Sequence, residues 1–193
     1  MEHFYENIRG WFSFPNLYKQ VVAKHQSEAH FVEVGSFLGK STCCMAVEII
    51  NSNKNIKFDC VDIWTDDSIN YLEGNKNNKL DCIENNRAYN EFLKNTETVR
   101  STINPIRLPS TEASNLYADN SLDFVFIDAN HSYEFVKDDI KHWYPKVKKG
   151  GILAGHDYRP AWPGVIQAVN EFISKNNYSL EIKSEHCWGF TKH

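Results

Sequence analysis

The stretch that decides the fold is Phe31-Val32-Glu33-Val34-Gly35-Ser36-Phe37-Leu38-Gly39-Lys40-Ser41. Its first four residues form a short apolar run with one acid, which predicts a buried strand that ends at Gly35. From Ser41 to Ile50 the apolar residues recur at helical spacing. A strand, a turn punctuated by glycines and a helix therefore follow one another. This succession is the repeating unit of an α/β sheet with crossover helices.

The glycine turn is the first candidate binding element. Gly35 and Gly39 allow the backbone to approach a ligand closely, and we expect the N–H groups at the start of the helix to face it. Glu33 beside the turn would repel a phosphate, so this acid favours a ligand with an amino group or a positive charge. The combination points toward S-adenosylmethionine, whose sulfonium and α-amino group are cationic.

Three other interpretations compete for the same turn. A dinucleotide fingerprint, G-x-G-x-x-G, is disfavoured because Phe37 stands where the second glycine belongs. A P-loop, G-x-x-x-x-G-K-[ST], has its ending in Gly39-Lys40-Ser41 but is one residue short, and its phosphate cradle depends on successive N–H groups that point inward. The third interpretation is a tight strand–helix turn without a ligand, which the motif alone leaves open.

Length and composition indicate the class of protein. A chain of 193 residues fits one domain, 1–193, and its 41% hydrophobic and 13% aromatic residues exclude overall disorder. The net charge of −4 without a long Lys/Arg block predicts no nucleic-acid partner. Five cysteines without a C-x-x-C pair predict reduced thiols, and with no signal peptide or apolar run of membrane length we expect a cytoplasmic protein without a membrane partner. Homo-oligomerisation stays open.

Alternation of strand and helix patterns predicts a mostly parallel sheet with helices on both faces. We expect seven strands, at residues 31–34, 56–62, 103–108, 122–128, 152–157, 178–182 and 187–191. An aromatic lead-in segment, 1–28, is expected to anchor on the sheet. Residues 64–99 contain an unusually long polar connection, so we interpret them as an insertion that covers the site or selects the acceptor.

Ionisable residues collect at the predicted strand ends, where ligands bind in open α/β sheets. Asp62 follows the glycine turn at the spacing of an acid that binds the hydroxyls of a ribose. Ile63 would pack on an adenine or simply fill the core. Ser110 would reach the adenine edge or cap the next helix.

Two further strand ends supply two histidines and two carboxylates. Asp128 reads either as the Mg²⁺-positioning acid of a nucleotide hydrolase or as a ligand of a metal shared with His156 and Asp157. His131 is the candidate proton acceptor for a hydroxyl. Oxygen-rich ligation would suit Mg²⁺ or Mn²⁺, and two histidines with one carboxylate would suit Fe(II). For each histidine alone, a structural hydrogen bond is the competing interpretation.

Four segments together resemble the class I S-adenosylmethionine-dependent methyltransferases. They are Phe-Val-Glu-Val-Gly-Ser-Phe-Leu-Gly-Lys-Ser, Cys-Val-Asp-Ile-Trp, Leu-Asp-Phe-Val-Phe-Ile-Asp-Ala-Asn-His-Ser-Tyr-Glu and Lys-Gly-Gly-Ile-Leu-Ala-Gly-His-Asp-Tyr. Their order and spacing over residues 30–175 are most similar to the small-molecule O-methyltransferases of the catechol and macrolide-sugar types. The resemblance implies a Rossmann-like, doubly wound sheet that closes with a C-terminal antiparallel hairpin.

The resemblance also implies roles for single residues. The methionine part of the cofactor would be surrounded by Glu33, Gly35, Ser36, Phe37, Gly39 and Ser41. Asp62 would bind the ribose, Ile63 and Ser110 would lie at the adenine, and Asp128 would border the cofactor. The divalent-metal positions fall on Asp128, His156 and Asp157, and His131 falls where the catechol branch has a lysine base. The pair His156-Asp157 departs from the usual Asp-Asp or Asp-Asn, which bears on the identity of the ion.

The predicted function is therefore transfer of a methyl group to a hydroxyl of a small molecule, sugar or phenol-like, with a divalent cation such as Mg²⁺ as a candidate helper. Two alternatives stay open. One is a P-loop-like nucleotide hydrolase, based on Gly39-Lys40-Ser41 and Asp128. The other is a module that binds S-adenosylmethionine without catalysis.

Overall fold

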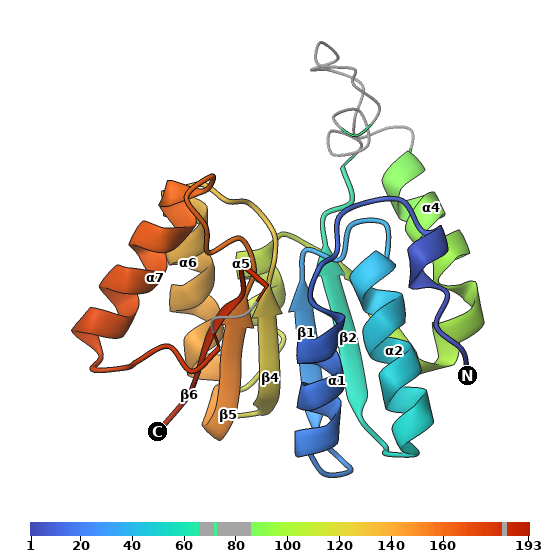
Figure 1. Cartoon of the computed structure of the whole chain (residues 1–193), viewed down its shortest axis with the longest axis horizontal. Helices are drawn as coiled ribbons and strands as arrows, with labels where there is room; N and C mark the ends of the chain where they lie inside the picture. The colour runs from blue at the N-terminus through green and yellow to red at the C-terminus, as the bar shows by residue number, and fades with distance from the viewer. Residues whose placement is uncertain (66–71, 73–85, 183–184) are drawn as a thin grey trace.

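A computed structural model of the chain describes residues 1–65, 72, 86–182 and 185–193 (Figure 1). In this part of the chain the strands form one six-stranded sheet in the order β3-β2-β1-β4-β5-β6. The strands are β1 His30–Val34, β2 Lys57–Asp62, β3 Ile103–Arg107, β4 Leu122–Ile127, β5 Val147–Gly155 and β6 Trp188–Thr191. Neighbouring strands are parallel except β6, which pairs antiparallel with β5. The expected doubly wound, mostly parallel sheet is confirmed.

The expected count of seven strands is wrong for the described residues. The segment 178–182 forms only an isolated β-bridge with the sheet, between Ile182 and Gly189. The N–H groups of Glu181 and Ile182 both donate to the single carbonyl of Gly189, at 2.8 and 3.1 Å. Because a ladder needs successive partners and this segment has one, it does not extend into a strand.

Helices cover both faces of the sheet, as Figure 1 shows. The α-helices are α1 Pro15–Lys24, α2 Lys40–Ser52, α4 Arg87–Asn95, α5 Ser110–Ser114, α6 Tyr133–Trp143 and α7 Pro163–Lys175. Three short 3₁₀ helices are η1 Tyr5–Asn7, η2 Glu97–Thr102 and η3 Tyr144–Lys146. In the described residues no helix is long and apolar enough to cross a membrane.

The core consists of two apolar layers, one on each side of the sheet. Side chains alternate along a strand, so Phe31 of β1 faces one layer and Val32 faces the other. The first layer packs α1, α2 and α4 on the sheet, and the second packs α5, α6 and α7 on it. Strands buried on both faces explain why β1 and β4 are nearly continuous apolar runs.

The N-terminal segment crosses the first layer and reaches the carboxyl ends of the strands. Phe14 is buried, and its ring lies 4.7 Å from the rings of Phe126 and His156. Arg9 holds the segment to α4 through two bonds to the carboxylate of Glu91, at 2.6 and 2.7 Å. The lead-in therefore contributes to the core and also borders the end of β5.

Most of the predicted insertion 64–99 lies outside the described residues. Its described parts are residues 64–65, Leu72, Asn86, α4 and the start of η2. The helix within it that the structure describes is α4, Arg87–Asn95.

Candidate active site

The candidate site lies at the carboxyl ends of β1 and β4, where the strand order reverses. β1 leads to β2 and β3 on one side, and β4 leads to β5 on the other. In open α/β sheets such a switch point is where ligands bind. Gly35 stands at this position with a φ of +94°. A Cβ added there would lie 2.1 Å from the carbonyl oxygen of Asp128, so only glycine lets the two strand ends meet.

The backbone amides of the turn are largely engaged inside the protein. The N–H of Gly35 donates to Val61 O at 2.8 Å, and that of Gly39 donates to Ser36 O at 2.8 Å. The N–H of Phe37 donates to a carboxylate oxygen of Asp62 at 2.9 Å. These three amides are therefore not available to a ligand, and the expectation that the N–H groups at the start of α2 face one stays a prediction. A carboxylate at an amide of the turn also opposes a phosphate there, which counts against a P-loop.

Glu33 lies beneath the turn and organises it. Its side chain is 1% exposed, one oxygen accepts from the Tyr18 hydroxyl at 2.7 Å, and the other accepts from the Thr42 hydroxyl. Burial raises the pKa of Glu33, and these hydrogen bonds oppose the shift. The carboxylate thus ties α1 and α2 to β1 at the base of the turn. Direct contact between Glu33 and a ligand cation stays a prediction.

Asp62, Phe37 and Trp64 form a closed hydrogen-bond network between the first two strand ends. Asp62 accepts from the Phe37 amide and, at 2.7 Å, from the Trp64 amide, while the Trp64 indole N–H donates to Phe37 O at 2.7 Å. Phe37 and Trp64 both have positive φ, +43° and +47°, a conformation uncommon for such bulky side chains. Burial raises the pKa of Asp62, and the backbone hydrogen bonds oppose the shift. The network fixes where the Asp62 carboxylate points.

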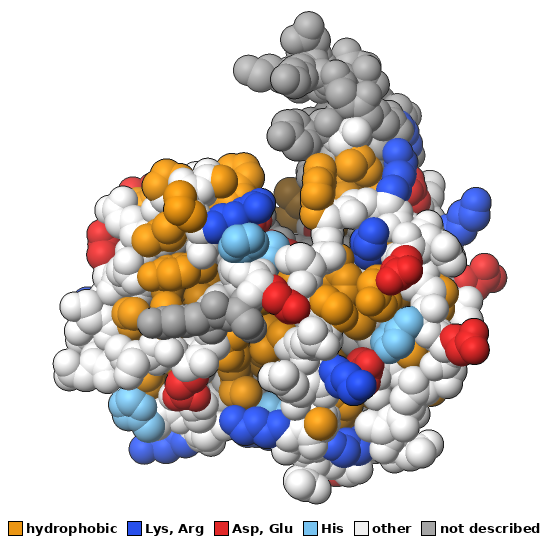
Figure 2. Space-filling view, in the orientation of Figure 1, with side chains coloured by type: hydrophobic (Ala, Val, Ile, Leu, Met, Phe, Trp, Pro, Cys, Tyr) orange, Lys and Arg blue, Asp and Glu red, His pale blue; other side chains and the backbone are white. Residues whose placement is uncertain are grey.

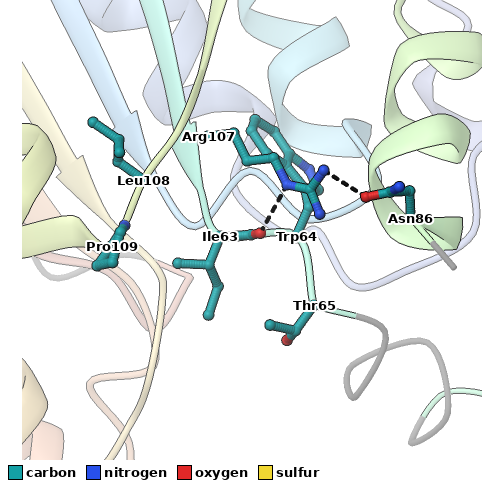
Figure 3. A pocket seen from close by; sticks show the side chains of 7 residues that line it. All are labelled: Ile63, Trp64, Thr65, Asn86, Arg107, Leu108 and Pro109. Carbon is teal, nitrogen blue, oxygen red and sulfur yellow. Dashed lines mark hydrogen bonds between the residues drawn. The ribbon is translucent and has the colours of Figure 1, made fainter. Parts of the chain in front are cut away.

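Beside this network a cavity of about 460 Å³ opens between the ends of β2 and β3 (Figure 3). It is lined by Ile63, Trp64, Thr65, Asn86, Arg107, Leu108 and Pro109. Ile63 is 47% exposed, so the interpretation that it fills the core is wrong. Arg107 donates to the Ile63 carbonyl at 3.3 Å and to the Asn86 side chain at 2.6 Å, which places its guanidinium along one wall. An apolar slot with polar groups at its edge suits a flat heterocycle.

Ser110 does not cap α5, because the N-cap position is Pro109 and Ser110 is the first helical residue. Its hydroxyl donates to Asp139 at 2.5 Å and accepts from the indole N–H of Trp143 at 2.9 Å. Both partners lie on α6, so this hydroxyl joins α5 to α6. The serine was singled out for its place after a strand, but a sequence does not reveal a partner 29 residues away.

The carboxylate of Asp139 is expected to weaken the fold at neutral pH. It is 4% exposed, and burial raises its pKa to about 6, opposed by the Ser110 bond and His142 and reinforced by Asp138. Because the folded state holds the proton more tightly than the unfolded state, stability is lost as the pH rises through 6, by up to about 3 kcal/mol. We expect Asp139→Asn to raise the urea midpoint at pH 7.5 and to have a clearly smaller effect near pH 4.5, because the loss develops between the unfolded and the folded pKa.

The exposed neighbour Asp138 supplies a comparison, Asp138→Asn, which removes only the charge that reinforces the shift and should raise the midpoint at pH 7.5 by less than Asp139→Asn does. Equal midpoints for wild type and Asp139→Asn at pH 7.5 would show that burial of this carboxylate costs nothing.

Four of the predicted residues meet at the ends of β4 and β5. Asp128, His131 and Asp157 each offer a ligand atom, and these atoms lie within 4.8 Å of one another. His131 Nε2 is 3.1 Å from an oxygen of Asp157 and 3.7 Å from one of Asp128. His156 Nδ1 is 3.7 Å from the same two carboxylates. The three ligand atoms that the structure brings together thus come from Asp128, His131 and Asp157, whereas the expected set was Asp128, His156 and Asp157. His156 lies beside this group.

The two histidines of this cluster differ in their surroundings. His156 Nε2 lies 3.1 Å from the Ser13 hydroxyl and 3.2 Å from the Glu185 carbonyl, so its far side is engaged by protein. Burial lowers the pKa of His156, but the hydrogen bond to Asp157 and the charges of Asp128 and Asp157 outweigh it and leave the pKa raised. For Asp157 burial raises the pKa, and the two histidines and Arg159 outweigh it and leave the pKa lowered.

The loop that carries His131 is held by the start of α7. A Cβ added at Gly164 would lie 2.5 Å from the Tyr133 amide nitrogen and 2.9 Å from the His131 carbonyl, so the helix packs directly on the loop. The indole of Trp162 lies 4.4 Å from the His131 ring. Glycine at 164 is thus required by close approach, and Trp162 covers one side of the imidazole.

Sequence reasoning missed several residues of the site. Ser13, Trp64, Arg159 and Trp162 all contact predicted site residues. Arg159 follows the Gly-His-Asp-Tyr segment directly, and its guanidinium Nε lies 2.8 Å from Asp157. A charged residue two positions after a predicted ligand is a signal that could have been used. The position of Ser13, 143 residues before His156, offered none.

Comparison with known proteins agrees with this geometry. Residues 32–158 match the family described as "Methyltransferase domain". The chain belongs to this family. Its mostly parallel, doubly wound sheet is of the kind that the resemblance to class I methyltransferases implied. An uncharacterised protein of Acanthamoeba polyphaga mimivirus is 39% identical over 57 residues, which are 28% of this chain and 26% of that protein. One of Sinorhizobium fredii is 25% identical over 126 residues, 65% of this chain and 13% of that protein. The chain thus spans about a quarter or less of these relatives.

Solved structures share the fold at low sequence identity. The O-methyltransferase NovP is 17% identical with a TM-score of 0.67, over 92% of this chain and 78% of that one. CalS11, a TDP-rhamnose 3'-O-methyltransferase of calicheamicin biosynthesis, is 15% identical with a TM-score of 0.60, over 92% and 76%. Fibrillarin of Aeropyrum pernix, with natively bound S-adenosyl-L-methionine, is 10% identical with a TM-score of 0.53, over 85% and 66%.

Proposed function

We propose that this chain transfers a methyl group from S-adenosylmethionine to a hydroxyl of a small molecule. The observation that carries the proposal is the contact between Gly35 and Asp128, which joins two half-sites. On one side lie the Asp62 network and the cavity beside Ile63. On the other side lies the cluster of carboxylates and imidazoles. A cofactor laid across the switch point would reach from the cavity to the cluster.

The residues present fit S-adenosylmethionine. The cavity beside Ile63, Leu108 and Pro109 suits the adenine, and Asp62 retains acceptor capacity for ribose hydroxyls beyond its two amide bonds. The Ser36 hydroxyl is buried in the turn, where it acts on the Glu33 carboxylate without forming a close hydrogen bond. A buried hydroxyl that lacks a close partner is costly, so a ligand group that bonds it would stabilise the turn. This hydroxyl supports binding of the methionine part there.

The cofactor supplies a methyl group on a sulfonium, and this charge makes the sulfur a good leaving group. The sulfur–carbon bond breaks as the oxygen–carbon bond forms, the hydroxyl proton leaves, and the products are S-adenosylhomocysteine and a methyl ether. The protein's main task is to align the acceptor oxygen with the methyl carbon. Gly35 and Asp128 would do so by bringing the turn and the cluster together.

The cluster also fits a divalent cation. Asp128, His131 and Asp157 would hold it, and His156 Nδ1 would complete the set or stay in its outer shell. Such an ion would lower the pKa of a hydroxyl bound to it. A mixed set of carboxylate and imidazole suits Mn²⁺ or Fe(II) better than Mg²⁺, which favours oxygen ligands.

His131 has two proposed roles, metal ligand and general base, and its Nε2 atom cannot fill both at once. Its Nε2 is the nitrogen that faces both carboxylates, and one lone pair cannot bind an ion and accept a proton together. With an ion in place, His131 is a ligand. Without one, the same nitrogen is the candidate general base, oriented by Asp157.

Calorimetric titration with S-adenosylhomocysteine tests the cofactor half of the proposal. We expect micromolar binding by the wild type, a loss of at least about tenfold for Asp62→Ala, and a loss of about three- to tenfold for Trp64→Phe, which removes one hydrogen bond of roughly 1 kcal/mol. Trp188→Phe is the matched control, because Trp188 is equally buried and lies on β6. Absence of heat with wild-type protein would overturn the assignment. Binding without methylation of any tested hydroxyl would favour the non-catalytic module.

A further inference from the structure

Beside the carboxylate–imidazole cluster, an exposed aromatic ring and an exposed guanidinium come from residues three positions apart in the sequence. Trp162 is 38% exposed and lies 4.4 Å from His131. The Arg159 side chain is 40% exposed and pairs with Asp157 at 2.8 Å. The Trp162 amide donates to the Arg159 carbonyl at 2.9 Å, so one turn presents both side chains. Figure 2 shows hydrophobic side chains next to basic and histidine side chains at this end of the α6–α7 half.

Arg159 has binding capacity that Asp157 does not use. The ion pair is made through Nε, and among the described residues the two terminal nitrogens of the guanidinium have no hydrogen-bond partner. A guanidinium presents its donors in a planar fork that matches a carboxylate or another oxyanion. The free half of this fork is therefore a candidate contact for a ligand anion.

Trp162 offers a complementary contact. Its ring lies 4.4 Å from the His131 ring in a tilted arrangement, and 38% of the residue remains exposed beside the cluster. Indole surfaces stack well on planar rings, with a favourable contribution of about 0.5–1.5 kcal/mol beyond buried area. The helix start at Pro163 and the contact of Gly164 with the His131 loop keep this ring fixed relative to the cluster.

We infer that the acceptor is a hydroxylated aromatic ring that carries an anionic group, with the ring against Trp162 and the anion at the terminal nitrogens of Arg159. This inference rests on the proposed function, because it deepens the acceptor side of the same site. Placed in this way, the hydroxyl of the ring points toward Asp128, His131 and Asp157. Arg159 and Trp162 then determine which hydroxyl compounds bind, and the cluster acts on whichever hydroxyl is presented.

The test compares two probes that differ only in charge, a dihydroxybenzoate and the corresponding dihydroxybenzamide. Each is titrated calorimetrically into the full chain already saturated with S-adenosylhomocysteine, so that no turnover is needed. We expect the carboxylate to bind about tenfold more tightly than the amide at low salt, with a smaller ratio at 0.5 M salt. Arg159→Gln should bring the ratio near one, and Arg159→Lys, which keeps the charge, should retain part of it.

Trp162→Ala should weaken both probes by a similar factor and leave their ratio unchanged, since it removes the shared ring contact. The matched controls are Arg9→Gln, which breaks the remote pair with Glu91, and Leu116→Ala, another exposed apolar residue; neither should change either affinity. A wild-type ratio near one, a ratio that survives Arg159→Gln, or no binding of either probe would overturn the inference. Failure of S-adenosylhomocysteine itself to bind would instead overturn the proposed function on which it rests.

Discussion

Replacing Gly35 with alanine should destabilise the protein more than other single methyl additions. The new Cβ would lie 2.1 Å from the Asp128 carbonyl oxygen, 2.5 Å from its carbon and 2.9 Å from the Ala129 Cα. All three are backbone atoms of the adjacent strand end, so no side chain can rotate away. The φ of +94° adds strain for any residue with a Cβ. We expect a loss of at least about 4 kcal/mol in the free energy of unfolding by urea, or failure to fold.

Gly150→Ala separates strain from collision. Gly150 also has a positive φ, +79°, but a Cβ added there would meet nothing within 4 Å. Gly150→Ala should lower the free energy of unfolding only by the strain of the left-handed conformation, about 1–2 kcal/mol. If the two variants lost equal stability, the close approach of the two strand ends would not be a requirement of the fold.

The strand ends that carry this contact could be predicted from the sequence, because their signals are local. Phe31 to Val34 and Leu122 to Ile127 are short apolar runs, each ending at a glycine or an acid. Since parallel strands end at one edge of a sheet, Asp128, His131, His156 and Asp157 were expected to lie close together, and the structure places them so. Their role as a site stays a prediction. The site was predictable to the extent that it depends on strand ends.

The features that could not be predicted depend on contacts between distant residues. Trp64 donates to a carbonyl 27 residues earlier, and Ser13 meets His156 across 143 residues. The sequence also does not show that the amides of the turn and the hydroxyl of Ser110 already have hydrogen-bond partners inside the protein. The seventh strand was overpredicted for the same reason, since the alternation at 178–182 does not show that only Gly189 is available as a partner.

Neutralising a carboxylate of the cluster should abolish most methyl transfer while cofactor binding survives. Asp157 pairs with His131 and Arg159, and Asp128 faces both histidines. Asp157→Asn keeps the shape of the side chain and removes its charge, so it should disturb a metal and a base alike. We expect turnover to fall about 100- to 10,000-fold, the range spanned by general acid–base catalysis. Affinity for S-adenosylhomocysteine should stay within about threefold of wild type, because Asp62 and the cavity are unchanged.

Asp123→Asn is the matched control. Asp123 lies on β4, the strand that leads to Asp128, but its carboxylate pairs with Lys148 and the His30 amide, outside the cluster. It should retain turnover.

Treatment with a chelator, followed by single divalent ions, then separates the two roles of His131. Turnover lost to the chelator and restored by Mn²⁺ or Fe(II) makes His131 a ligand, whereas turnover that survives the chelator but not His131→Gln makes it the base. Whether the cluster holds an ion or supplies the base, the reaction needs the Asp157 carboxylate or the His131 imidazole. If Asp157→Asn and His131→Gln both keep full turnover, the acceptor hydroxyl therefore reacts elsewhere.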